Sequence, residues 1–165
     1  MITFKKIKKN EKQELSRLID IVLENLERKD FFIPFDDEEI EAMFDEENAV
    51  TYGAYDGDKL IGTAQLYWGD EFVDTIKESL GVKDSLSAEF DGVLVLPEYR
   101  GNGIMKQFSR ILISEAQKRS YEYIVSVAHP ENIASNKAIS AMGAKLMKTD
   151  YLGKYFRNMY LLELK

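Results

Sequence analysis

The sequence lacks cysteine altogether and contains only one histidine and three prolines in 165 residues. Without cysteine the chain has no disulfide, no thiolate nucleophile and no cysteine metal ligand. A single histidine argues against a metal site built from histidines, so we expect no bound metal. No apolar run approaches the roughly 20 residues that span a bilayer, so we expect no contact with the membrane interior. The basic N-terminal segment has no apolar run after it, and we therefore expect no secretory signal and a cytoplasmic protein.

The charge balance of the chain is acidic, with a net charge of −7 and a sequence pI of about 4.9. Proteins that bind nucleic acids neutralise phosphates with basic side chains, so this balance argues against a nucleic-acid partner. Acidity favours a small cationic partner, although it is also explained by solubility alone. Apolar residues make up 45% and charged residues 31% of the chain, which is typical of a globular protein. The length predicts one domain over residues 1–165.

The order of elements predicted from hydrophobic periodicity is mixed α/β. Helical spacing of apolar residues predicts helices at residues 11–29, 36–47, 69–83, 103–119 and 132–142. Runs with strand character predict strands at residues 2–7, 49–55, 60–68, 89–96, 121–128, 144–152 and 154–164. The turn Asp56-Gly57-Asp58 joins two of these strands as a hairpin, and Asp36 is placed to cap a helix.

The stretch VLVLPEYRGNGIMKQF, residues 93–108, ends a buried strand and opens a helix. Pro97 has no backbone donor, so the chain leaves the sheet there. Gly101 and Gly103 let the backbone bend tightly, and the first amides of the following helix favour an anion. Arg100 adds a positive charge with several donors. The spacing predicts a site for phosphate or pyrophosphate, with a purely structural turn as the alternative.

Two blocks of the sequence resemble those of the GNAT superfamily of N-acetyltransferases. PEYRGNGIMKQF resembles its pyrophosphate loop, with the motif Arg/Gln-x-x-Gly-x-Gly/Ala, and HPENIASNKAISAMGAKL resembles its Asn-x-x-Ser helix. The match covers about residues 89–146. It implies a single-domain α/β (α+β) fold with a mixed central sheet of about six to seven strands flanked by helices. It also implies acetyl transfer from acetyl-CoA to a primary amine, by direct attack in a ternary complex.

The same resemblance implies which residues hold the donor. Backbone groups of Leu94, Val95 and Leu96 would bind the thioester and the pantetheine arm. The pyrophosphate would lie on the loop formed by Arg100, Gly101, Asn102, Gly103, Ile104, Met105 and Lys106, although Met105 stands where glycine or alanine is usual. Asn132 and Asn136 would contact the arm of CoA, and Asn132 is equally suited to cap the helix.

Attack on a thioester requires a neutral amine, and only about one part in 2,500 of an amine with a pKa near 10.4 is neutral at pH 7. A general base is therefore expected. Glu89 and Asp91 share one face of the buried strand with Val93 and Val95 by period-two alternation. We predict Glu89 as the base, because some members of the superfamily carry one at this position. The alternative, which we prefer for Asp91, is a carboxylate that faces solvent.

Ile139 stands where many members of the superfamily carry a tyrosine that protonates the leaving thiolate. Tyr151 and Tyr155 are the nearest replacements by sequence, and we predict Tyr151 as the acid. A thiolate with a free pKa near 8.5 also leaves without an acid. The missing tyrosine keeps open a non-catalytic module that binds acyl-CoA, and a third possibility is an interaction domain that binds neither substrate.

The acceptor is left open by the sequence. A small amine and a protein N-terminus or lysine are all compatible with it, and the acidic residues between 36 and 47 are suited to attract a cationic amine. Residues 69–87 form a longer link than is usual in the superfamily and are placed to contribute to an acceptor pocket. A homodimer is compatible with the resemblance, since many relatives are dimers.

Overall fold

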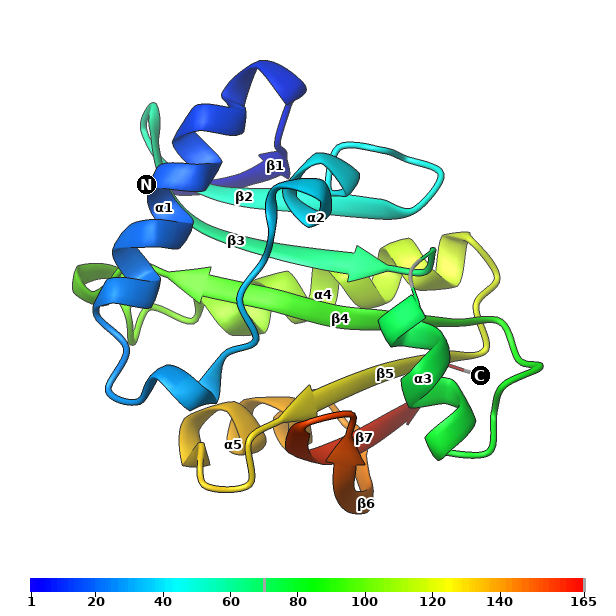
Figure 1. The fold of residues 1–165 in the computed structure, drawn as a ribbon. Helices are drawn as coiled ribbons and strands as arrows, with labels where there is room; N and C mark the ends of the chain where they lie inside the picture. The colour runs from blue at the N-terminus through cyan, green and yellow to red at the C-terminus, as the bar shows by residue number, and fades with distance from the viewer. Residues whose placement is uncertain (70, 165) are drawn as a thin grey trace.

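A computed structural model describes residues 1–69 and 71–164 of the chain. Its strands are β1 Ile2–Lys6, β2 Ala49–Asp56, β3 Lys59–Tyr67, β4 Ser87–Val95, β5 Tyr123–Ala128, β6 Lys145–Leu152 and β7 Tyr155–Glu163 (Figure 1). Its α-helices are α1 Lys12–Glu24, α2 Asp37–Ala42, α3 Glu71–Ser79, α4 Ile104–Lys118 and α5 Ile133–Ala141. Three short 3-10 helices, η1 Lys9–Glu11, η2 Lys29–Phe31 and η3 Pro97–Tyr99, complete the described elements.

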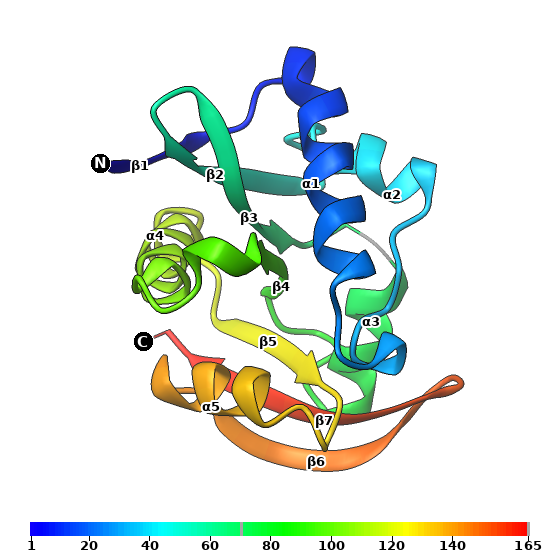
Figure 2. The ribbon, with the colours of Figure 1, turned by 90° about the vertical axis from the view of Figure 1, so that its left-hand side faces the viewer.

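The described strands form one seven-stranded sheet in the order β1-β2-β3-β4-β5-β7-β6. β4 and β5 are the parallel pair, and the other neighbouring strands are antiparallel. Helices α1, α2 and α3 lie on one face of the sheet, and α4 and α5 lie on the other (Figure 2). The buried apolar core is continuous through the sheet, with Leu15 and Leu18 of α1 on one side and Phe108 and Leu112 of α4 on the other. The predicted fold class is thus confirmed.

The predicted helices are present but shorter than expected. α1 ends at Glu24, and Asn25 after it donates from its side chain to the carbonyl of Ile21 at 2.8 Å. The prediction for residues 69–83 includes residue 70, which lies outside the described residues, and α3 occupies part of that range. Asp36 caps α2 as predicted, since its side chain accepts from the amide of Glu39 at 2.8 Å. None of the helices in the described ranges is long and apolar enough to cross a membrane.

A β-bulge in β4 overturns the predicted alternation of that strand. Gln65 of β3 pairs with Asp91, and Thr63 pairs with Leu94, so two residues of β4 lie opposite Ala64. Because residues that lie opposite each other share a face, Leu94 is on the face of Asp91, together with Glu89. Val93 and Val95 therefore do not both continue the face of Glu89, contrary to the prediction. A glycine in a strand interior is a signal for a bulge, and Gly92 provides it.

Candidate active site

The parallel strands β4 and β5 separate soon after they begin, which opens the middle of the sheet. In the described chain they pair at three positions, the last of which joins Glu89 to Val125. At the fork, the hydroxyl of Ser126 donates to the carbonyl of Phe90 at 3.0 Å. Beyond it the two strands diverge toward their C-terminal ends (Figure 1). Beyond Glu89 and Val125, the backbones of β4 and β5 are therefore not joined to each other as neighbouring strands.

A cleft of about 880 Å³ occupies the fork and extends under the segment that joins α1 to α2. This volume lies within the range of small-molecule sites. One wall is formed by the sheet, by the turn before α4, and by α4 and α5. It includes Glu89, Asp91, Val93, Leu94, Val95, Arg100, Met105, Ser126, Asn132, Ser135, Ala138, Ile139 and Arg157. The opposite wall, formed around α1, α2 and α3, contributes Glu27, Phe31, Phe32, Asp36, Glu38, Glu71 and Phe72, among others. The cleft therefore joins a site at the sheet to an acidic, aromatic wall.

The turn before α4 contains two glycines in the left-handed region of φ. Gly101 and Gly103 adopt φ angles of +82° and +71°, and no heavy atom lies within 4 Å of the position that a Cβ would take at either residue. α4 has no side-chain cap, and the side chain of Asn102 instead donates to the carbonyl of Tyr99 at 2.8 Å. The two glycines thus have open space beside them, next to the first amides of α4 and the positive end of the helix dipole.

The two asparagines predicted to contact CoA have different surroundings. Asn132 lines the cleft and also caps α5, because its side chain accepts from the amide of Ser135 at 3.2 Å. Asn136 donates to the carbonyls of His129 and Asn132, and its oxygen accepts from Asn158 and Tyr160. Both of its donors and both lone pairs are used, so Asn136 has no capacity left for a ligand, contrary to its predicted role. It instead fixes α5 against β7.

Glu89 is buried in the wall of the cleft at the point where the strands separate. Its side chain is 1% exposed, which rules out the alternative that it faces solvent. It lies opposite Tyr67, whose hydroxyl points to α2 and donates to the carbonyl of Glu39 at 3.5 Å, so Glu89 faces the α1–α3 side of the sheet. Asp91 is half-buried and also lines the cleft, rather than lying freely in solvent.

The tyrosine predicted as the acid lies elsewhere. Tyr151 is 63% exposed on β6, its ring packs at a tilt against that of Phe156 with the centroids 4.9 Å apart, and it is not among the residues that line the cleft. Ile139 does line the cleft and is 4% exposed, so the position of the usual tyrosine is filled by an apolar side chain. The sequence suggested Tyr151 because it lies near Ile139 along the chain, but the β6–β7 hairpin places it outside the cleft.

A network of charged residues ties the segment after α1 to the turn after β5. Arg28 forms ion pairs with Asp30 and with Glu131, and the Arg28 guanidinium lowers the pKa of both carboxyl groups. His129 lies 3.3 Å from Asp30, and its ring is 5.2 Å from that of Phe31. These contacts give His129 a structural role. The network holds η2 over the end of the cleft.

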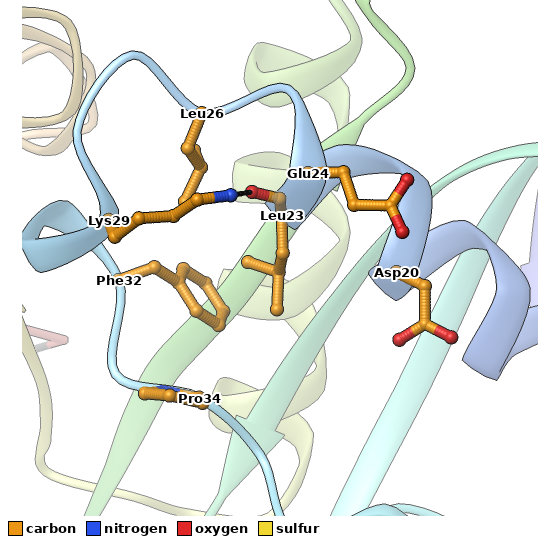
Figure 3. A pocket seen from close by; sticks show the side chains of 7 residues that line it. All are labelled: Asp20, Leu23, Glu24, Leu26, Lys29, Phe32 and Pro34. Atoms are coloured by element: carbon orange, nitrogen blue, oxygen red, sulfur yellow. Dashed lines mark hydrogen bonds between the residues drawn. The ribbon is translucent and has the colours of Figure 1, made fainter.

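A smaller cavity of about 230 Å³ lies on the outer side of the same segment (Figure 3). Lys29 donates across it to the carbonyl of Leu23 at 2.7 Å. Leu26 and Phe32 line both this cavity and the large cleft. The segment between α1 and α2 is therefore a thin wall, with space on both sides.

Solved structures with the same fold include N-acetyltransferases. An N-acetyltransferase from Staphylococcus aureus Mu50 superposes with a TM-score of 0.75 at 18% identity, covering 100% of this chain and 99% of that one. YncA from Salmonella typhimurium, solved with its cofactor acetyl-CoA, has a TM-score of 0.74 at 15% identity, covering 99% and 94%. The ribosomal-protein-S18-alanine N-acetyltransferase from Escherichia coli has a TM-score of 0.74 at 13% identity, covering 100% and 95%. The fold is thus that of an N-acetyltransferase.

The sequence also matches a family model. The model of the acetyltransferase (GNAT) family matches residues 21–144, which include both walls of the fork and the turn before α4. The chain belongs to the GNAT family of acetyltransferases, and the resemblance seen in the two sequence blocks is confirmed. No curated protein sequence shows significant similarity to the chain.

Proposed function

We propose that this protein transfers the acetyl group of acetyl-CoA to the primary amine of an acceptor in a ternary complex. One observation carries the proposal: the fork between β4 and β5 opens a cleft that has the glycine turn before α4 on one side and a buried carboxylate, Glu89, at its apex. Acetyl-CoA supplies an activated thioester and a pyrophosphate. The residues around the fork suit both groups, since the turn at Gly101 and Gly103 is open and the pairing of β4 with β5 ends at Glu89 and Val125.

Backbone donors of β4 would orient the thioester. The amide of Leu96 donates to the carbonyl of Ile61 of β3 at 2.9 Å, so this amide is not available to the thioester. Successive residues of a strand direct their N–H groups to opposite edges, so the amide of Val95 points into the fork. In our proposal Val95 donates to the carbonyl oxygen of the thioester, where negative charge develops during attack.

Glu89 would act as the general base. Its carboxylate lies at the fork, on the face of the sheet that carries the acidic wall of the cleft. From there it would accept a proton from the ammonium of the acceptor, directly or through one water molecule, and so supply the neutral amine. After attack the nitrogen carries one proton more than the amide product, and this proton would pass to the leaving thiolate, directly or through water. No protein acid would be needed, and none is placed for the role, because Ile139 is apolar and Tyr151 lies outside the cleft.

The acidic wall would attract a cationic acceptor, and this gives a first testable prediction. Glu27, Glu38 and Glu71 are exposed and line the cleft, so their triple change to glutamine removes three negative charges along the entry path. We expect KM for amine acceptors to rise about 3- to 10-fold and to depend less on ionic strength. Steady-state kinetics between low and high salt measure both effects.

The matched control changes three acids outside the cleft, Glu14, Glu46 and Glu163, to glutamine. The two variants have the same net charge, so a response of KM that is equal in both would assign the effect to overall charge and contradict a role for the acidic wall.

The transfer itself is tested by a screen of acceptors with acetyl-CoA, with release of free thiol as the readout. The panel includes small amines, amino acids, and peptides with free N-termini or lysines. A second function, a module that binds acyl-CoA without catalysis, is favoured by one observation, the apolar Ile139 in the cleft. Binding of acetyl-CoA in calorimetry without thiol release from any amine would support that module. Absence of binding at millimolar acetyl-CoA would refute both functions.

A further inference from the structure

Arg157 is a buried cation at a position where its strand otherwise carries apolar residues. In β7 it alternates in phase with Met159 and Leu161, which pack in an apolar cluster with Phe72 and Ile76 of α3. Its exposed fraction is 4%, yet it lines the cleft beside the segment between α1 and α2. The guanidinium therefore lies in the protein interior, at the edge of a cavity large enough for a small molecule.

The contacts of Arg157 leave much of its hydrogen-bonding capacity unused. One terminal nitrogen donates to the carbonyl of Phe156 and the other to the carbonyl of Asp30, each at 2.9 Å. A guanidinium has five N–H donors, so three remain. None of the ion pairs among the described residues includes Arg157. Burial lowers the pKa of Arg157, while the nearby charge of Asp30 acts in the opposite direction, and the guanidinium carbon lies 5.3 Å from the centre of the Tyr155 ring. A buried cation that forms no direct ion pair is costly to maintain.

The position of Arg157 relative to Glu89 follows from the strand register. Glu89 lies opposite Val125, and Val125 lies opposite Leu161, so all three share one face of the sheet. Arg157 is on the same face, four residues before Leu161. The two Cα positions are thus separated by about 13 Å along the strands and about 10 Å across them. Both side chains line the same cleft, so a short molecule between them meets a carboxylate at one end and a guanidinium at the other.

We propose that Arg157 binds a carboxylate of the acceptor, so that the acceptor is a small molecule with both an amine and a carboxylate, such as a free amino acid. The ammonium group of such a zwitterion is drawn to the acidic wall and to Glu89, while its carboxylate pairs with the planar fork of the guanidinium. The inference rests on the proposed acetyl transfer and names the substrate class of the same site. A peptide N-terminus lacks this carboxylate next to its amine.

The experiment compares free amino acids with their carboxamides as acceptors, which differ only in the negative charge. For the wild-type protein, we expect kcat/KM to be at least about 10-fold higher for the acid than for the amide, as a charge-assisted hydrogen bond provides. In Arg157→Gln this ratio should fall to about 1, because the amide side chain keeps a donor for the carbonyl of Asp30 but loses the charge. Arg157→Lys should give an intermediate ratio. Arg110→Gln, an exposed arginine of α4 outside the cleft, is the matched control and should keep the wild-type ratio.

Three results would overturn the inference. A wild-type ratio near 1, with amines acetylated, would show that the acceptor needs no carboxylate. An unchanged ratio in Arg157→Gln, with kcat/KM lowered equally for acid and amide, would assign Arg157 a structural role only. Weaker binding of acetyl-CoA by Arg157→Gln in calorimetry, again with an unchanged ratio, would show that the guanidinium contacts acetyl-CoA and not the acceptor. Failure to acetylate any amine would instead refute the proposed function, and the inference would fall with it.

Discussion

Replacement of Glu89 by glutamine is expected to lower kcat by about 10²- to 10⁴-fold and to leave the affinity for acetyl-CoA unchanged. The size of the effect is that of a lost general base, since glutamine has the shape of glutamate but accepts no proton at neutral pH. Glu89 lies at the apex of the cleft and is buried, so no bulk water replaces it at that position. Steady-state kinetics with a saturating amine give kcat, and calorimetry with acetyl-CoA gives the affinity.

The matched control is Glu115→Gln, another change of a buried glutamate. Glu115 lies on α4, accepts from the hydroxyl of Tyr52 at 2.9 Å and pairs with Arg119, and it does not line the cleft. We expect this variant to lose stability while kcat remains near that of the wild type. If Glu89→Gln retained the wild-type kcat, another group would have to be the base.

Replacement of Gly103 by valine is expected to weaken the binding of acetyl-CoA by at least about 10-fold. Gly103 has a φ angle of +71°, a conformation that a β-branched residue adopts only with strain. Its side chain would also project into the open space above the first amides of α4, where the pyrophosphate is proposed to lie. Loss of one hydrogen bond to a charged group accounts for an effect of this size. The dissociation constant of acetyl-CoA is measured by calorimetry.

Gly57→Val separates backbone strain from the loss of the anion site. Gly57 is in the hairpin turn between β2 and β3, with a φ angle of +60° and no heavy atom within 4 Å of its Cβ position. The two substitutions thus impose a similar backbone strain, and at both positions the new side chain has room. Both variants should be less stable by about 1–2 kcal/mol, but only Gly103→Val should bind acetyl-CoA poorly. Equal affinities in the two variants would contradict a pyrophosphate site at the turn before α4.

Much of the fold could be predicted because its signals are local. Hydrophobic periodicity located the strands and helices, since the side of an element that faces the core repeats with the geometry of the element itself. The turn at Arg100 to Gly103 was found for the same reason: the glycines, the proline before them and the helix after them lie within a few residues. The cap at Asp36 depends on a residue three positions away, and it too was predicted.

Features that depend on distant residues were predicted poorly. The bulge in β4 is defined only by its register with β3, and it places Leu94, in place of the predicted valines, on the face of Glu89. Asn136 was predicted to meet a ligand, but β7 supplies the two donors that occupy its oxygen. Tyr151 was chosen by its nearness in sequence, and the hairpin places it outside the cleft. Arg157 was missed, although a cation in phase with Met159 and Leu161 was a signal that the sequence contained.

By itself, the sequence determined the family, the order of the elements and the turn that suits an anion, because each depends on residues that are close together along the chain. The tertiary structure decided which side chains meet at the fork between β4 and β5. Glu89, Ser126 and Arg157 come from three different strands, and the wall opposite them comes from the segment between α1 and α2 and from α3. Their contact depends on strand order and register, which are set by packing of the whole sheet and not by any short stretch of residues.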